Sequence, residues 1–224
     1  MSKSGDTSGV AGGVESAIEA FRRGTPVCIH DAADREGETD IVYPAGAVTP
    51  EAVAHVRNDA GGLVCVALSD AVAEAFALPF LREKLDHPAA HDETLSYGDR
   101  SAFSLTVNHR ETDTGITDED RSLTIRALAD AAADPEGTDF PAVFQSPGHV
   151  HLLRAAPGLL ADRQGHTEMA LALARAADRP PAAVVCEMLD DETGGALLPA
   201  AARAYAERND IPYVEGASIV ERFG

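Results

Sequence analysis

Strand-like apolar runs and helical segments alternate along most of the chain, and this alternation is the strongest constraint on its fold. Short runs rich in β-branched residues occupy residues 26–30, 63–68 and 183–188. Between them lie segments with helical spacing of apolar residues or with helix-start signals, such as Thr49 followed by Pro50. We find no internal repeat. The pattern predicts a single α/β or α+β domain with helices packed on a mixed β-sheet.

The element boundaries follow from capping and turn signals. We expect a flexible N-terminal tail over residues 1–12, one domain over residues 13–224, and an irregular loop over residues 82–100, which are rich in charge, His, Pro and Gly. Helices are expected over residues 14–23, 50–60, 117–133, 167–177 and 199–208, with a further helix opening at Ser69. Strands are expected over residues 26–30, 41–46, 63–68, 102–107 and 183–188, within 142–154, and from Tyr213.

The charge balance limits the classes of partner. The chain carries 37 acidic and 18 basic residues, a formal net charge of -19, so nucleic acid is not an expected partner. No apolar stretch reaches the length of a membrane span, and the polar, glycine-rich N-terminus lacks the apolar core of a signal peptide. We therefore expect no membrane association and a cytoplasmic location.

The three cysteines lie in apolar runs. Cys28, Cys65 and Cys186 are spaced in no zinc-binding pattern, and their number is odd. Cysteine in such a run is usually a small buried hydrophobic residue. We predict that all three are structural and that none forms a disulfide.

Carboxylates are concentrated directly after the first predicted strand. The segment HDAADREGETD (30–40) holds five of them, and in an extended chain Glu36, Glu38 and Asp40 would point to one side. Mg²⁺ takes oxygen ligands of this kind, and Arg35 could reach a phosphate. The alternative is a solvated charged loop of an acidic protein. The position at the end of a buried strand, where α/β proteins bind ligands, favours a site.

A second polar group, RQGHTE (163–168), precedes a predicted helix. Gly165 allows a tight turn, and Thr167 lies at a helix start, where backbone N–H groups favour a phosphate. Arg163 could pair with that phosphate through two hydrogen bonds, and His166 could bind a metal through a neutral ring nitrogen. The alternative is an ordinary histidine near a helix N-terminus.

Several segments, in this order, resemble the 3,4-dihydroxy-2-butanone 4-phosphate synthase family. They are REGETD (35–40), GGLVCVALSD (61–70), TDTGITDEDRSLTIRAL (112–128), SPGH (146–149) with a following arginine, RQGHTE (163–168) and AAVVCEMLDDETG (182–194). The resemblance covers roughly residues 14–220. The sequence departs from many family members at His151, at Leu152 and in the stretch after Glu187.

The resemblance implies a lyase that converts D-ribulose 5-phosphate to L-3,4-dihydroxy-2-butanone 4-phosphate and formate in riboflavin biosynthesis. It implies Mg²⁺ or Mn²⁺, two ions per active site, and a homodimer. The chain is too short for the second, GTP-cyclohydrolase-like domain of some relatives, so we expect a monofunctional enzyme.

The resemblance also implies roles for individual residues. Glu36 and His166 would hold the metal. The catalytic candidates are His149 and Glu187, with Asp31 and Glu38 as helpers. The residues expected to contact substrate are Arg35, Glu36, Asp40, Thr114, Arg163, Gln164, Gly165, His166, Thr167 and Glu187.

Two other functions are compatible with the same residues. Another metal-dependent sugar-phosphate isomerase or aldolase would share the metal and phosphate groups but release no formate. A cation- or phosphate-binding module would have acidic clusters over its whole surface, without a histidine, arginine and threonine gathered at one of them.

The composition predicts a dependence of stability on salt. The cations are 16 arginines and only two lysines, Lys3 and Lys84, and the acidic excess is typical of a halophilic archaeon, whose cytoplasmic salt screens the repulsion between carboxylates. We expect the free energy of unfolding to fall as KCl is removed, as measured by urea denaturation over a KCl series. A free energy that does not fall at low salt would contradict this hypothesis.

Overall fold

The computed structural model describes residues 13–31, 37–90 and 100–224. The tail predicted over residues 1–12 lies outside the described residues, as do Arg35 and Glu36 of the acidic segment.

One seven-stranded sheet forms the centre of the molecule. Its strand order is β4-β5-β3-β6-β2-β1-β7. The pairs β3–β5 and β1–β7 are parallel and the other neighbours are antiparallel, which confirms the predicted mixed sheet. The strands are β1 (Val27–His30), β2 (Thr39–Pro44), β3 (Cys65–Leu68), β4 (Phe103–His109), β5 (Phe144–Arg154), β6 (Ala182–Glu187) and β7 (Tyr213–Glu215).

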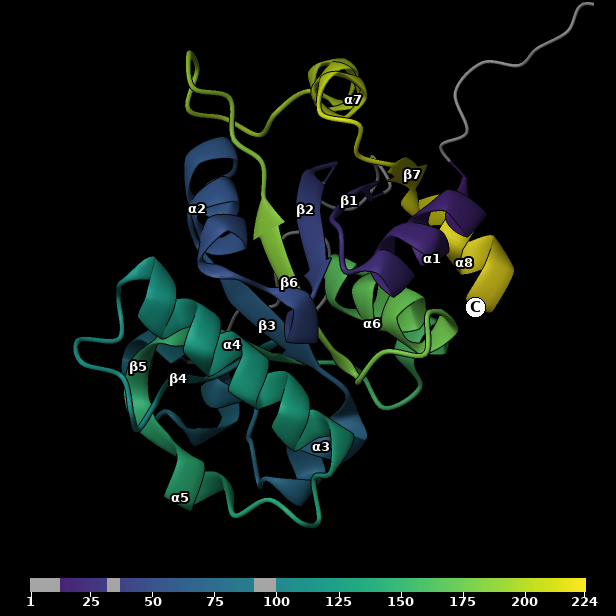
Figure 1. The fold of residues 1–224 in the computed structure, drawn as a ribbon. Coiled ribbons are helices and arrows are strands. Elements are labelled where there is room, and N and C mark those ends of the chain that lie inside the picture. The colour runs from purple at the N-terminus through teal and green to yellow at the C-terminus, as the bar shows by residue number, and fades with distance from the viewer. Residues whose placement is uncertain (1–12, 32–36, 91–99) are drawn as a thin grey trace, which may run out of the picture.

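Helices cover both faces of this sheet (Figure 1). Apolar side chains of α1 (Val14–Arg23), α6 (His166–Ala176) and α8 (Gly216–Phe223) pack on one face. Those of α2 (Pro50–Asp59), α4 (Asp118–Ala133) and α7 (Pro199–Arg208) pack on the other. The short helix α3 (Asp70–Ala75) contributes Val72 and Ala73 to the same core as α4, and the short helix α5 (Phe140–Val143) directly precedes β5 and contacts it.

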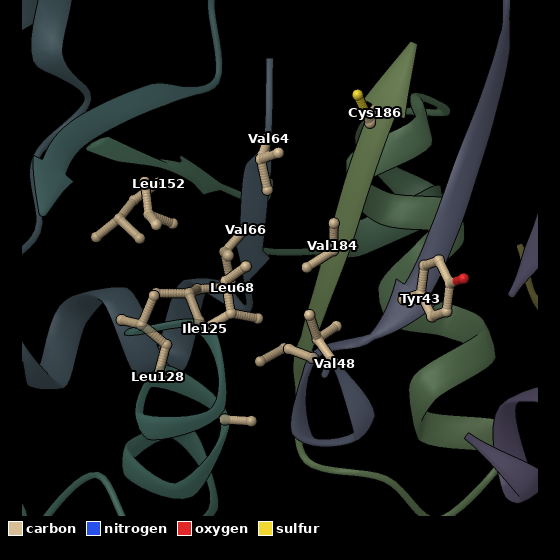
Figure 2. Close-up of a cluster of buried hydrophobic side chains, with 14 of the residues drawn as sticks. Tyr43, Val48, Val64, Val66, Leu68, Ile125, Leu128, Leu152, Val184 and Cys186 are labelled. Atoms are coloured by element: carbon tan, nitrogen blue, oxygen red, sulfur yellow. The ribbon is translucent and has the colours of Figure 1, made fainter. Parts of the chain in front are cut away.

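The core between the sheet and α4 fixes the two central strands. Val66 of β3 and Val184 of β6 are fully buried, and Ile125 and Leu128 of α4 belong to the same cluster (Figure 2). Burial of each such side chain contributes about 1.5–3 kcal/mol. Because β3 and β6 are buried on both faces, their sequences read as continuous apolar runs rather than alternating ones.

Local capping signals set the helix ends as predicted. Gly24 ends α1 with φ of 80°, the left-handed conformation that glycine adopts readily. The side chains of Thr49, Ser69 and Thr117 accept hydrogen bonds from backbone N–H groups in the first turns of α2, α3 and α4.

Some elements differ from the prediction. β2 begins at Thr39 rather than at Ile41, because β1 pairs with it as far as His30 opposite Thr39, and Asp40 therefore lies within the strand. The helices α5 and α8 were not expected; each is short and has no side-chain cap. Short 3₁₀ turns, Leu81–Lys84 and Pro88–Ala90, occupy part of the predicted irregular loop. Among the helices of the described ranges, none is long and apolar enough to span a bilayer.

A chain of hydrogen-bonded side chains joins α2, β2 and α7 on the α4 side of the sheet. The Tyr43 hydroxyl lies 2.6 Å from His55 Nδ1, and His55 Nε2 lies 2.6 Å from the Tyr205 hydroxyl. The Tyr205 hydroxyl in turn donates to Asp59 over 2.7 Å. Burial and these neighbours raise the pKa of Tyr43 to about 12 and that of Tyr205 further, so both hydroxyls keep their protons.

We expect Tyr205→Phe to lower the free energy of unfolding by about 1–3 kcal/mol, because His55 Nε2 loses its hydrogen-bond partner at a half-buried position and the exposed Asp59 loses a donor. Chemical denaturation measures this loss. The matched control on the same helix is Glu207→Gln, at an exposed position, which should change the free energy by less than about 0.5 kcal/mol. Equal effects of the two substitutions would contradict the proposed contribution of the chain of hydrogen bonds.

Candidate active site

A cavity of about 250 Å³ lies on the α6 face of the sheet. Its apolar wall comes from Cys65, Leu153 and Val185, whose side chains belong to the core between the sheet and α6. The full lining, as far as the described residues form it, is Asp40, Leu63, Cys65, Ser101, Ala102, Phe103, Leu153, Arg163, His166, Thr167, Val185, Cys186 and Glu187. An apolar wall with a few convergent polar groups is typical of a site for a small molecule.

Two carboxylates lie side by side at one end of this cavity. Asp40 of β2 is directly opposite Glu187 of β6 in the antiparallel register, and both line the cavity. Side chains at such positions lie about 5 Å apart. Asp40 is 3% exposed, whereas Glu187 is open to solvent. The pairing therefore places one buried and one accessible carboxylate within reach of the same ligand.

The first residue of α6 brings an imidazole to these carboxylates. His166 Nδ1 lies 3.5 Å from Asp40 Oδ1. The acidic segment and the RQGHTE segment thus meet in space, although Glu36 itself lies outside the described residues. His166 is 6% exposed and lines the wall of the cavity. It is buried because α6 is buried along nearly its whole length.

The same helix start supplies groups suited to an anion. Gly165 is the N-cap of α6 and supplies no capping side chain, and the N–H groups at the start of a helix favour an anion. Thr167 is buried in this turn and lines the cavity, and Arg163 lies just before it in the same wall. Gln164, also expected to contact substrate, is exposed and is not in the lining.

Asp31 and Glu38 have structural contacts in the described part of the acidic segment. Asp31 Oδ1 accepts hydrogen bonds from the backbone of Gly37 and of Glu38, over 2.7 and 3.2 Å. The Asp31 N–H donates to the Glu38 carbonyl over 3.1 Å. These bonds close the base of the segment between β1 and β2. Neither side chain belongs to the described lining of the cavity.

His149 and Thr114 lie outside this cavity. His149, on β5, is exposed, and its backbone N–H donates to Asn108 over 2.8 Å. Thr114 is exposed in the loop before α4, where Asp120 accepts hydrogen bonds from the loop and the pKa of its carboxyl is lowered, chiefly by the Gly115 N–H. The described lining of the cavity contains neither residue.

Arg154, the arginine that follows SPGH, forms hydrogen bonds and ion pairs with other parts of the chain. Arg154 Nε donates to Asp70 over 2.8 Å, Nη1 donates to the Leu78 carbonyl over 2.8 Å, and Glu74 is a further partner. The guanidinium also lies over the ring of Phe80. These contacts join the end of β5 to α3.

Sequence reasoning did not identify several residues of the lining, among them Phe103, Leu63 and Cys186. They come from strands or strand ends that are distant in the sequence, and only the strand order brings them together. Cys65, interpreted as a core residue, is buried and also forms part of the wall. The sequence signal that included Cys65 was the resemblance of the segment GGLVCVALSD (61–70) to the family.

The donor groups fit a divalent cation in part. A histidine that binds a metal commonly has its other ring nitrogen next to a carboxylate, and the His166 Nδ1–Asp40 pair has this arrangement. Among the described residues, no group of three or more His, Cys, Asp or Glu side chains is placed to hold a metal ion. The second expected ligand, Glu36, lies outside the described residues.

Comparison with known proteins gives a consistent result. Residues 15–222 match the family model described as 3,4-dihydroxy-2-butanone 4-phosphate synthase. The chain is 48% identical to the protein of that name from Archaeoglobus fulgidus, covering 93% of each. It is 44% identical to that from Methanosarcina mazei, covering 94% of this chain and 90% of the relative.

Solved structures of proteins with the same name also resemble this chain. The synthase from Candida albicans superposes with a TM-score of 0.79 at 32% identity, over 95% of this chain and 97% of that chain. Another synthase, solved in complex with two magnesium ions, gives a TM-score of 0.81 at 30% identity, over 94% and 95% of the two chains.

The buried thiols generate a prediction about reactivity. All three cysteines are free, and burial raises the pKa of Cys28 and Cys186 to about 12 and that of Cys65 further. Because the thiolate is the reactive form, we expect Ellman's reagent at pH 8 to label the native protein more than about a thousandfold more slowly than the protein in guanidinium chloride. Rapid labelling of any thiol in the native state would contradict this expectation.

Proposed function

This chain belongs to the 3,4-dihydroxy-2-butanone 4-phosphate synthase family, and on that premise we propose that the cavity between β2, β6 and α6 is where it binds ribulose 5-phosphate. The family converts ribulose 5-phosphate to 3,4-dihydroxy-2-butanone 4-phosphate in riboflavin biosynthesis. The observation that carries the proposal is the meeting of Asp40, Arg163, His166, Thr167 and Glu187 in one cavity.

The phosphate of the substrate would bind at the start of α6. Backbone N–H groups of the first turn and the positive end of the helix dipole favour an anion there. The Thr167 hydroxyl is a further donor, and Arg163 brings a guanidinium to the same wall. In a chain of net charge -19, this local concentration of donors is what would overcome the general repulsion of an anionic substrate.

The sugar carbons would then lie toward Asp40 and Glu187. The reaction begins with removal of a proton next to the ketone, which needs a base, and later steps need a group that returns protons. Glu187 is accessible and can exchange protons with solvent, whereas the buried Asp40 holds the His166 ring in orientation. We assign Glu187 as an acid–base residue and Asp40 as a residue that positions substrate and imidazole.

We expect Mg²⁺ or Mn²⁺ at this end of the cavity, held by His166 and Glu36, with two ions per site. A relative of the same fold binds two magnesium ions. A bound divalent ion supplies Lewis-acid stabilisation of negative charge on the substrate oxygens. The residues of the chain supply the ligands and the orientation: His166 offers a ring nitrogen, and the Asp40 carboxylate beside Nδ1 fixes its tautomer.

A second copy of the chain would complete the site. His149 and Thr114, the expected acid–base and substrate residues, are exposed outside the cavity of their own subunit. Leu63 and Phe103 line the cavity yet remain 44% and 40% exposed, which is an apolar rim suited to an interface. A homodimer in which one subunit places His149 and Thr114 at the cavity of the other accounts for both observations.

The direct test is incubation with ribulose 5-phosphate and Mg²⁺, with formate measured enzymatically and the four-carbon product identified by NMR. We expect stoichiometric formate and product, and no turnover after removal of divalent ions with EDTA. Sugar-phosphate products without formate would instead indicate an isomerase or aldolase. Near-normal turnover in EDTA would contradict the metal role.

Substitution of the expected metal ligands gives a second test. Glu36→Ala and His166→Ala should each lower kcat by more than about a hundredfold, because each removes a ligand group. Glu207→Ala on α7 is the control and should keep wild-type kcat. Since His166 is buried, its variant also needs a thermal unfolding curve, and a folded variant with near-normal kcat would contradict the assignment.

A further inference from the structure

Glu168 is a buried carboxylate that the proposed reaction does not use. It follows Thr167 in the first turn of α6 and has no exposed surface (0%). Burial raises the pKa of its carboxyl, and Arg163 and the hydrogen bonds that it accepts oppose this shift. A carboxylate at such a position lowers the free energy of unfolding unless its partners compensate.

Its two oxygens bind two different parts of the chain. Oε2 accepts a hydrogen bond from Arg163 Nη1 over 2.8 Å. Oε1 accepts from the backbone N–H of Ala156 over 3.0 Å. Ala156 lies shortly after the end of β5, and Arg163 lies shortly before the N-cap of α6, so one carboxylate joins the two ends of the connection between these elements.

Gly165 provides the space for this arrangement. A Cβ atom on Gly165 would lie 2.5 Å from Arg163 Nη1 and 3.1 Å from Glu168 Oε2. The guanidinium therefore packs against the backbone of Gly165, at a distance that a side chain there would prevent. Glycine at the N-cap thus serves the orientation of Arg163 as well as the turn of the backbone.

Stability alone does not explain the pair. Replacement of a buried ion pair by well-packed apolar residues is often neutral or stabilising, so a pair of this kind is weak evidence for a stabilising role. In a capping box, a glutamate three residues after the N-cap accepts a hydrogen bond from the N-cap N–H. Here the carboxylate instead accepts from Arg163, a residue of the cavity wall.

We propose that Glu168 is a positioning residue, which holds the Arg163 guanidinium in the orientation that binds the phosphate of the substrate. This inference rests on the proposed contact between Arg163 and the phosphate. The arginine is part-buried and lines the cavity, while its Nη1 is held by Glu168. If the Arg163 guanidinium is held in place before the substrate binds, binding no longer carries the entropic cost of ordering this long side chain.

The test compares Glu168→Gln, Arg163→Gln and the double variant. Glutamine keeps the shape of Glu168 but replaces one acceptor oxygen by an NH₂ group, so it cannot accept from both Arg163 and Ala156. We measure kcat and KM for ribulose 5-phosphate and the inhibition constant of inorganic phosphate. Each single substitution should raise KM and the inhibition constant by about tenfold or more, with a smaller change in kcat.

The double variant separates positioning from a general structural effect. If Glu168 acts through Arg163, the double variant should bind phosphate no more weakly than Arg163→Gln alone. Additive losses, or an unchanged KM in Glu168→Gln beside a raised KM in Arg163→Gln, would overturn the proposal. The matched control is Glu215→Gln, which removes a carboxylate from an exposed pair with Arg203 and should leave KM unchanged.

Two further results are decisive. An unchanged KM in Arg163→Gln would overturn both the positioning role and the phosphate contact, whereas formate release by the wild type would still support the family reaction. If Glu168→Gln does not fold, Glu168→Asp takes its place: it keeps the charge but is too short to reach both partners. A wild-type KM and phosphate inhibition constant in that variant would overturn the proposal.

Discussion

The antiparallel pairing of β2 with β6 is the constraint on which the site depends. It sets Asp40 opposite Glu187, and a shift of β2 by one residue along β6 would turn the Asp40 side chain to the opposite face of the sheet, away from Glu187. The register is fixed by the apolar residues of the same two strands, since Val42 and Val185 face α6 while Ile41 and Val184 face α4. The core that stabilises the fold therefore also places the two carboxylates.

Helix α6 is the second part of this arrangement. Residues 166–174 are all buried, so the helix has no polar face along this stretch, and the polar side chains of His166, Thr167 and Glu168 lie at its start with little or no exposed surface. Polar groups in such a position are costly unless they are hydrogen-bonded or bind a ligand. Each of the three has such a reason: His166 faces Asp40, Glu168 holds Arg163, and Thr167 lines the cavity.

Much of the fold could be predicted from local signals, because the chain places them at the element ends. Gly24, Thr49 and Thr117 marked helix ends that the structure confirms. The short α8 was missed, since its N-cap offers no side-chain hydrogen bond and its stability comes from packing of Ile219 against distant elements. Strand order, which depends on non-local pairing, could not be read from the sequence at all.

The site was predicted unevenly, and the reason is physical. Residues in compact segments, such as Arg163, His166 and Thr167, could be recognised because neighbouring groups at a helix start act together. Residues of the wall, such as Leu63 and Phe103, are apolar and come from separate strands, so nothing in their local sequence distinguishes them from core residues.

Glu168 belongs to neither class. The sequence RQGHTE shows that residue 168 is a glutamate, but the role of this glutamate depends on where its side chain points. An exposed glutamate in the first turn would favour the helix through its charge alone. Because α6 is buried, this carboxylate must find partners inside the protein, and Arg163 is the cation in reach. The burial that makes Glu168 costly therefore also fixes Arg163 in the wall of the cavity, beside the start of α6.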